Sequence, residues 1–215
     1  MTKLFSYKNR PMHLGPYPLE KLARGAMPDL SAIPAMEPVS FRRPEDPASL
    51  VNAMQEYQAM LDATRTGMVK KEMGVIPEDR FERANHLKSF GYYCDASMVG
   101  TCVIPAETWL KTPLKNPDVD RLSVKLQTLQ PKTFAAGIDV ILASLRENVK
   151  APPSSCSHHS HAIVFLTEYL RDPRMGEAGG DWLHNAQAQR ACLRGSETSV
   201  TIASYIRSLG RDARA

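Results

Sequence analysis

The densest group of side chains able to do chemistry lies at residues 156–161, where the chain reads Cys-Ser-His-His-Ser-His from Cys156 to His161. Imidazole nitrogens and thiolate sulfurs are the ligands that transition metals prefer. Adjacent residues of an extended chain point to opposite sides, however, so His158 and His159 are not expected to share a ligand set. We therefore interpret this segment as a polar turn between a helix and a strand, and predict no metal site in the chain.

Two other groups have the residue types of known sites but not their spacing. The glycine-rich loop at residues 175–181 matches neither phosphate-binding glycine pattern, and its acidic residues would repel an anion. Asp181 is instead predicted to cap the final helix. Residues 196–198 follow Arg194 and His184 but lack the G-x-S-x-G nucleophile pattern. The sequence therefore offers no catalytic residue.

The cysteines bear on redox chemistry and on metal clusters. There are four, at Cys94, Cys102, Cys156 and Cys192, and none lies within three residues of another. This spacing excludes C-x-x-C zinc and iron–sulfur motifs within the chain. We interpret the cysteines as reduced, small buried hydrophobes and expect the chain alone to bind no cofactor.

The overall composition is that of a soluble globular protein. Apolar residues make up 43% and charged residues 23%, and the formal net charge is +4. The basic residues are scattered, so no nucleic-acid partner is expected. No apolar run reaches the roughly 20 residues of a membrane span, and the N-terminus lacks the apolar region of a secretory signal. We expect a cytoplasmic protein with no membrane partner.

Proline content divides the chain into a proline-rich arm, residues 1–45, and an α/β domain, residues 46–215. The arm also carries apolar and aromatic residues, so we interpret it as an ordered segment that wraps over a partner surface, with a short helix near residues 19–24. In the domain, Asp46 and Pro47 are predicted to open a helix that ends near Gly67. The face predicted to be buried comprises Leu50, Met54, Tyr57 and Leu61.

Further helices are predicted at residues 77–91, 118–129, 134–148 and 187–209, and buried strands at residues 98–104 and 162–166. This alternation predicts an α/β or α+β fold. Gly210 is a stop signal for the last helix, after which residues 211–213 would begin a strand. The small residues of that helix are predicted to form one close-packing face, which comprises Ser196, Val200, Ala203 and Ser204.

Three segments resemble the soluble, non-exported branch of the cobalamin-dependent reductive dehalogenases. Residues 84–105 resemble a family helix that leads into a strand, through Leu87-Lys88-Ser89-Phe90-Gly91, Asp95-Ala96 and Val99-Gly100. Residues 203–213, Ala-Ser-Tyr-Ile-Arg-Ser-Leu-Gly-Arg-Asp-Ala, resemble a later family helix, with Arg211 where a tyrosine is usual. The opening, residues 5–11 and 13–18, resembles the start of that branch.

The resemblance implies a nitroreductase-like fold that cradles base-off cobalamin, with two [4Fe–4S] clusters that pass electrons to cobalt for removal of halide from an organohalide. The family's cysteine motifs and catalytic residues follow the matched region, so no catalytic, cofactor or metal residue is carried over. We expect this chain to be the N-terminal portion of such an oxidoreductase, a truncated product or a partial gene, and to be inactive alone. The domain at residues 46–215 would then be an incomplete nitroreductase-like fold.

The sequence also leaves two other functions open. One is a flavin-binding nitroreductase-like redox module, although the chain lacks an early Ser-x-Arg phosphate-binding pattern. The other is a non-catalytic interaction protein that uses the proline-rich arm, and a homo-oligomer is compatible with each. The organohalide and the electron donor are not specified by the sequence.

Overall fold

The computed structural model describes residues 29, 31, 43–109, 116–128, 145–147, 149–150, 155–168, 171–174 and 176–215. The elements are α1 (Leu50–Ala63), α2 (Arg80–Tyr93), β1 (Met98–Val103), the 3-10 helix η4 (Ala106–Thr108), α3 (Pro117–Thr128), β2 (His161–Leu166), α5 (Gly180–Leu183) and α6 (Ala186–Ser208). The fold is mixed α+β, as predicted. The arm, except for a few residues, and the helix expected at residues 19–24 lie outside the described residues. Of the helix expected at 134–148, only residues 145–147 are described, and they are helical.

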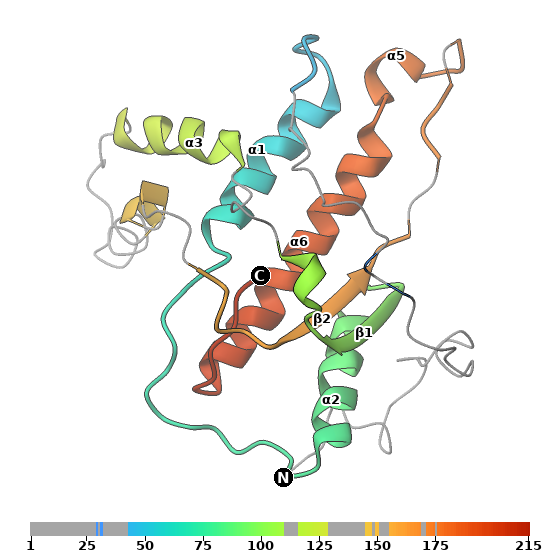
Figure 1. Ribbon diagram of the computed structural model, residues 1–215. Coiled ribbons are helices and arrows are strands. Elements are labelled where there is room, and N and C mark those ends of the chain that lie inside the picture. Colours follow the sequence, from blue (N-terminus) through green and yellow to red (C-terminus); the bar gives the residue numbers. More distant parts are fainter. Residues whose placement is uncertain are drawn as a thin grey trace.

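The long helix α6 organises the fold (Figure 1). It packs along α1, which contacts α3 on another side, while α2 packs against β1 and also touches α6. Among the described residues, two small clusters form the apolar core. One joins α1 and α3 through Ala63 and Leu126, and the other joins α2 to the sheet through Tyr92 and Val99. The α6 helix therefore connects two regions that each have a small core of their own.

The two strands form an antiparallel pair in which Val99 lies opposite Phe165 and Gly100 opposite Val164. The Val99–Phe165 face packs against α2, where Gly91 lets the sheet approach the helix closely. On the other face Val164 and Leu166 are 46% and 54% exposed. The predicted strands are confirmed, but the expectation that both would be buried was wrong, because only one face of the pair is covered in the described structure.

The first helix differs from the prediction at its start, its end and its face. Asp46 accepts a hydrogen bond from the Ala48 backbone N–H at 2.8 Å, so it stabilises a turn, and α1 begins only at Leu50. The helix ends at Ala63 rather than near Gly67. Its buried side chains are small or amide-bearing, namely Val51, Gln55, Gln58, Ala59 and Ala63. The predicted apolar face was wrong, since Leu50 and Tyr57 are 40% and 46% exposed.

The start of α2 lies a few residues beyond the predicted one. Asp79 is its N-cap, and its carboxylate accepts from the Phe81 backbone N–H at 3.0 Å. Pro77 therefore precedes the helix rather than opening it. The aromatic side chain of Phe81, in the first turn, is 73% exposed. The buried residues of α2 lie in its last turns.

The end of α6 lies where the sequence predicts. Gly210 has φ of 75°, and its N–H donates to the Arg207 carbonyl while the Arg211 N–H donates to the Ile206 carbonyl. These two bonds form a Schellman motif, in which the left-handed glycine satisfies carbonyls at the helix end. The strand expected from residue 211 is not formed, since residues 211–215 are extended without a ladder.

The start of α6 at Ala186 lies one residue from the predicted start, but the predicted N-cap was wrong. Asp181 is not its N-cap, because the short helix α5 intervenes and α6 begins at Ala186, after Asn185 in a left-handed conformation. Among the described residues, no helix combines the length and the apolar character needed to cross a membrane.

Candidate functional site

Two of the three segments that carry the family resemblance meet where α2 crosses α6. The Tyr205 hydroxyl lies 2.9 Å from Nε2 of His86, and the two rings stack with centroids 5.9 Å apart. The edge of Phe90 completes the contact, with centroids of Phe90 and Tyr205 5.1 Å apart. Burial lowers the pKa of His86, and the negative charge of Glu82 offsets part of that shift. Burial also raises the pKa of Tyr205. Both groups are therefore neutral near pH 7, as befits a structural contact.

A second group of polar residues surrounds the C-terminal end of α6. The Arg207 side chain is 6% exposed and donates to the Ala213 carbonyl at 2.9 Å and to the Arg65 carbonyl at 3.4 Å. The Lys70 N–H donates to the Arg207 carbonyl, and the Gly74 N–H to the Leu209 carbonyl, both at 3.0 Å. The loop after α1 thus satisfies carbonyls at the end of α6, and Arg207 holds the segment that follows the helix.

The same extended segment reaches the polar turn at residues 156–161. His158 Nε2 lies 2.6 Å from the Asp212 Oδ2 atom, and His159 Nε2 lies 3.8 Å from it. The Arg214 guanidinium donates to the Cys156 sulfur at 2.9 Å. Hydrogen bonding from His158 is the main cause that lowers the pKa of Asp212, whose carboxylate is therefore ionised. Arg65 lies near this group, and burial, followed by the charge of Arg214, lowers its pKa.

The prediction that His158 and His159 point to opposite sides was wrong. Residues 157 and 158 form a turn, closed by a hydrogen bond from the His159 N–H to the Cys156 carbonyl. Strand alternation does not apply in a turn, and the two rings lie 4.2 Å apart. His161 is separate and contacts Ser160 instead. The serines around residue 156 are a turn signal that could have revealed this, whereas no sequence signal points to Asp212.

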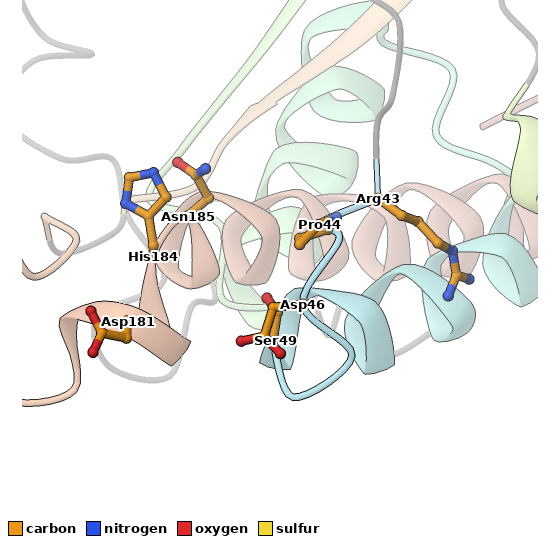
Figure 2. A pocket seen from close by; sticks show the side chains of 7 residues that line it. All are labelled: Arg43, Pro44, Asp46, Ser49, Asp181, His184 and Asn185. Carbon is orange, nitrogen blue, oxygen red and sulfur yellow. The ribbon is translucent and has the colours of Figure 1, made fainter.

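A polar cavity of about 320 Å³ lies between the start of α1 and the start of α6 (Figure 2). Its lining residues are Arg43, Pro44, Asp46, Ser49, Asp181, His184 and Asn185. The guanidinium of Arg43 is engaged by Asp118, with an Nε–Oδ1 distance of 2.9 Å. The carboxylates of Asp46 and Asp181 remain in the lining, so the cavity does not favour an anionic ligand.

The residues near Ser196 are not assembled into a nucleophilic site. Ser196 accepts a hydrogen bond from the Gln58 amide of α1, Arg194 faces Asp95 at 3.7 Å, and His184 lines the cavity. The predicted packing face is confirmed at Ser196 and at Ala203, which is 4% exposed, but Ser204 is exposed and lies off it.

Thr198 makes a contact between helices that no sequence signal predicted. Its hydroxyl donates to the Cys94 carbonyl at 3.1 Å and ties α6 to the end of α2. This contact places Thr198 on the buried stripe of α6, one turn before Ile202.

The four cysteines do not fit an iron–sulfur cluster. All are free thiols, and Cys102 and Cys192 are exposed, which corrects the expectation that the cysteines would be buried. Burial, with the charges of Asp95 and Glu197, raises the pKa of Cys94, which disfavours the thiolate that a cluster requires. In the described part of the chain, the only group of three potential metal ligands is His158, His159 and Asp212, which contains no cysteine.

The cavity in Figure 2 does not fit cobalamin either. The cavity in Figure 2 is at the lower end of the range for small-molecule sites, about 300–1,000 Å³, and its lining carries charged residues with Pro44 as the one apolar side chain. This cavity therefore lacks the apolar walls that small-molecule sites usually have.

No protein-family model matches the chain, and no curated protein matches it. Solved structures do match. The chain is similar over 98% of its length to the catabolic reductive dehalogenase NpRdhA, with 28% identity and a TM-score of 0.56. For NpRdhA in complex with 3-bromo-4-hydroxybenzoic acid, the identity is 30% and the TM-score 0.57, again over 98% of this chain.

A further similar structure is that of a reductive dehalogenase from which a mechanism for B12-dependent dehalogenation was suggested, with 31% identity and a TM-score of 0.58 over 98% of this chain. The chain covers only 23–24% of the solved relatives, so it spans about a quarter of their length. This likeness supports a distant relation of the chain to reductive dehalogenases.

Proposed function

We propose that this chain is the N-terminal portion of a cobalamin-dependent, reductive dehalogenase-like oxidoreductase that removes halide from an organohalide. The observation that carries the proposal is a likeness over 98% of the chain at 28–31% identity, extending over about a quarter of each solved relative. In this proposal the chain supplies scaffold, and the groups that hold cobalamin and the iron–sulfur clusters come from the remainder of the fold.

The roles of the family-like residues support a scaffold. Tyr205 contacts His86, Arg207 fixes the segment after α6, and Gly210 forms the Schellman turn. Tyr205, Arg207 and Gly210 lie in the family-like segment 203–213 and His86 in the family-like segment 84–105, and each makes contacts within the chain. These contacts support a role for the segment in holding the fold together, and none of them requires that it take part in catalysis.

The uncovered face of the strand pair is the second support. A Cβ built on Gly100 meets no atom within 4 Å, and Val164 and Leu166 on the same face are about half exposed. Contiguous exposed apolar surface marks a place where further structure packs. We propose that the remainder of a nitroreductase-like fold covers this face, with residues 46–215 as the N-terminal part of that domain and residues 1–45 as an arm.

The test is to read the transcript beyond codon 215 in the source cells and to measure the size of the protein there with an antibody against this chain. The expected result is an open frame with C-x-x-C-x-x-C motifs and a polypeptide about four times as long. A protein of 215 residues that purifies yellow would instead support the flavin-binding module. A colourless protein of that size, stable and without cofactor uptake, would support the interaction protein.

A further inference from the structure

Three ligand atoms of the types that bind transition metals converge beside the last turn of α6. One imidazole nitrogen from each of His158 and His159 and a carboxylate oxygen of Asp212 all lie within 4.8 Å of one another. His158 and Asp212 are 60% and 53% exposed and His159 is 21% exposed, so the group opens to solvent on one side. We call these three residues the trio.

Contacts that do not involve the ligand atoms hold both sides of the trio. On one side, the hydrogen bond from the His159 N–H to the Cys156 carbonyl closes the turn that carries both imidazoles. On the other, the Schellman turn at Gly210 and the bond from Arg207 to the Ala213 carbonyl fix the backbone on either side of Asp212. The ligand set is therefore positioned by the fold rather than by its own hydrogen bond.

We propose that the trio binds a divalent transition-metal ion of borderline softness, for which Zn²⁺ is the probe. Two imidazoles and one carboxylate are a common three-residue ligand set, and the fourth position would be left to water. Tetrahedral Zn²⁺ with ligand bonds of about 2.0–2.1 Å spaces its ligand atoms about 3.3 Å apart. The two Nε2–Oδ2 separations of 2.6 and 3.8 Å fall on either side of that value, and the whole set lies within 4.8 Å, so side-chain rotations would bring the three atoms to it.

Binding would require a change of tautomer at His158. The proton on Nε2 that points to Asp212 would move to Nδ1, because metal-binding imidazole is neutral and presents a lone pair at the ligating nitrogen. The ion would link the turn before β2 to residues 211–215, which are 54 positions apart at His158 and Asp212. The site is independent of the proposed dehalogenase function, since it uses no residue assigned to that reaction.

The experiment is a Zn²⁺ titration of the chelator-treated full chain, in competition with a chromophoric chelator. His158→Ala and Asp212→Asn should each weaken Zn²⁺ binding at least tenfold. The matched control is His161→Ala, which removes a nearby exposed imidazole outside the trio and should change binding less than twofold. Far-UV circular dichroism of each variant checks that the fold is retained.

Two further readouts distinguish this site from others. With Co²⁺ in place of Zn²⁺, the spectrum should show d–d bands without sulfur charge transfer, and Cys156→Ser should bind Zn²⁺ as the wild type does. Zn²⁺ should also slow tryptic cleavage after Arg211 in the wild type but not in His159→Ala. Wild-type affinity in both His158→Ala and Asp212→Asn would overturn the proposal, as would loss of binding in Cys156→Ser or His161→Ala.

Discussion

The hydroxyl of Tyr205 lies 2.9 Å from Nε2 of His86, and this contact joins two of the three family-like segments across 119 positions of sequence. Burial keeps both side chains neutral, with the pKa of His86 lowered and that of Tyr205 raised. A neutral hydrogen bond of this kind contributes about 0.5–1.5 kcal/mol to the free energy of unfolding. The contact is therefore a structural link whose strength depends on pH.

The first prediction concerns that pH dependence. The unfolded chain has His86 with a pKa near 6.5, whereas burial holds the folded value lower. Below about pH 6.5 the unfolded state therefore binds the proton more readily, and the free energy of unfolding should fall as the pH drops. Denaturant melts at pH 7.5 and 5.5 should show a smaller loss in His86→Gln than in the wild type. The exposed control His161→Gln should behave as the wild type, and equal losses in His86→Gln and the wild type would refute the assignment.

The second prediction uses two glycines on opposite faces of the strand pair. A Cβ at Gly91 would lie 2.7 Å from Val99 Cγ2 and 2.9 Å from Phe165 Cε1, whereas one at Gly100 meets nothing within 4 Å. Overpacking costs about 1–3 kcal/mol, against a gain in helix propensity of about 1 kcal/mol. Gly91→Ala should therefore lower the free energy of unfolding by up to about 2 kcal/mol, and Gly100→Ala should not lower it. If urea melts show both variants equally stable, the close approach of α2 to β1 is wrong.

The third prediction concerns the packing face of α6. Ala203 is 4% exposed, whereas its neighbour Ser204 is exposed. Ala203→Leu should cost about 1–3 kcal/mol by overpacking, and Ser204→Leu should stay within about 0.5 kcal/mol of the wild type. Ser196→Ala removes the bond to Gln58 and should cost about 0.5–1.5 kcal/mol. Chemical denaturation measures the free energy of unfolding of all three variants. If Ala203→Leu is as stable as the wild type and Ser204→Leu is destabilised, Ala203 does not lie on the packed face of α6.

The fourth prediction concerns Arg207. Its buried guanidinium donates to the Arg65 and Ala213 carbonyls, so Arg207→Met keeps the aliphatic stem but removes both hydrogen bonds, and the Arg65 carbonyl keeps its bond from the Ala215 N–H. Hydrogen bonds to charged groups contribute about 1.5–3 kcal/mol, and a loss of that order is expected. Amide hydrogen exchange should quicken at residues 207–215. The control Arg211→Met removes an exposed arginine and should leave exchange unchanged, and protection retained in Arg207→Met would show that Arg207 does not hold the segment.

Helix ends and strands that depend on interactions between residues close in sequence could be predicted from the sequence. Gly210 ends α6 because a left-handed turn there satisfies carbonyls, and the apolar runs at 98–104 and 162–166 form the two strands. The buried face of α1 was not predictable from its apolar stripe. Small side chains of α6 allow close approach, and Gln58 finds a partner in Ser196, so amide side chains are buried instead.

The polar groups were harder to predict, because their partners are far away in sequence. His158 meets Asp212 only because the chain after α6 turns back toward the loop before β2, and no pattern within either segment encodes that encounter. Likewise, the burial of Arg207 depends on carbonyls of two separate loops. Residue spacing within a segment predicted whether it forms a helix or a strand. Which polar side chains meet depends on how segments that are distant in sequence pack together.

The most direct test of the proposed function is a chimera in which this chain replaces the matching quarter of NpRdhA. The measurement is the cobalamin retained per polypeptide after anaerobic purification and gel filtration. We expect the chimera to retain cobalamin in near-stoichiometric amount, while NpRdhA lacking that quarter retains little. A chimera that folds with native-like circular dichroism yet retains no more cobalamin than the truncated enzyme would contradict the proposal that this chain is a dehalogenase scaffold.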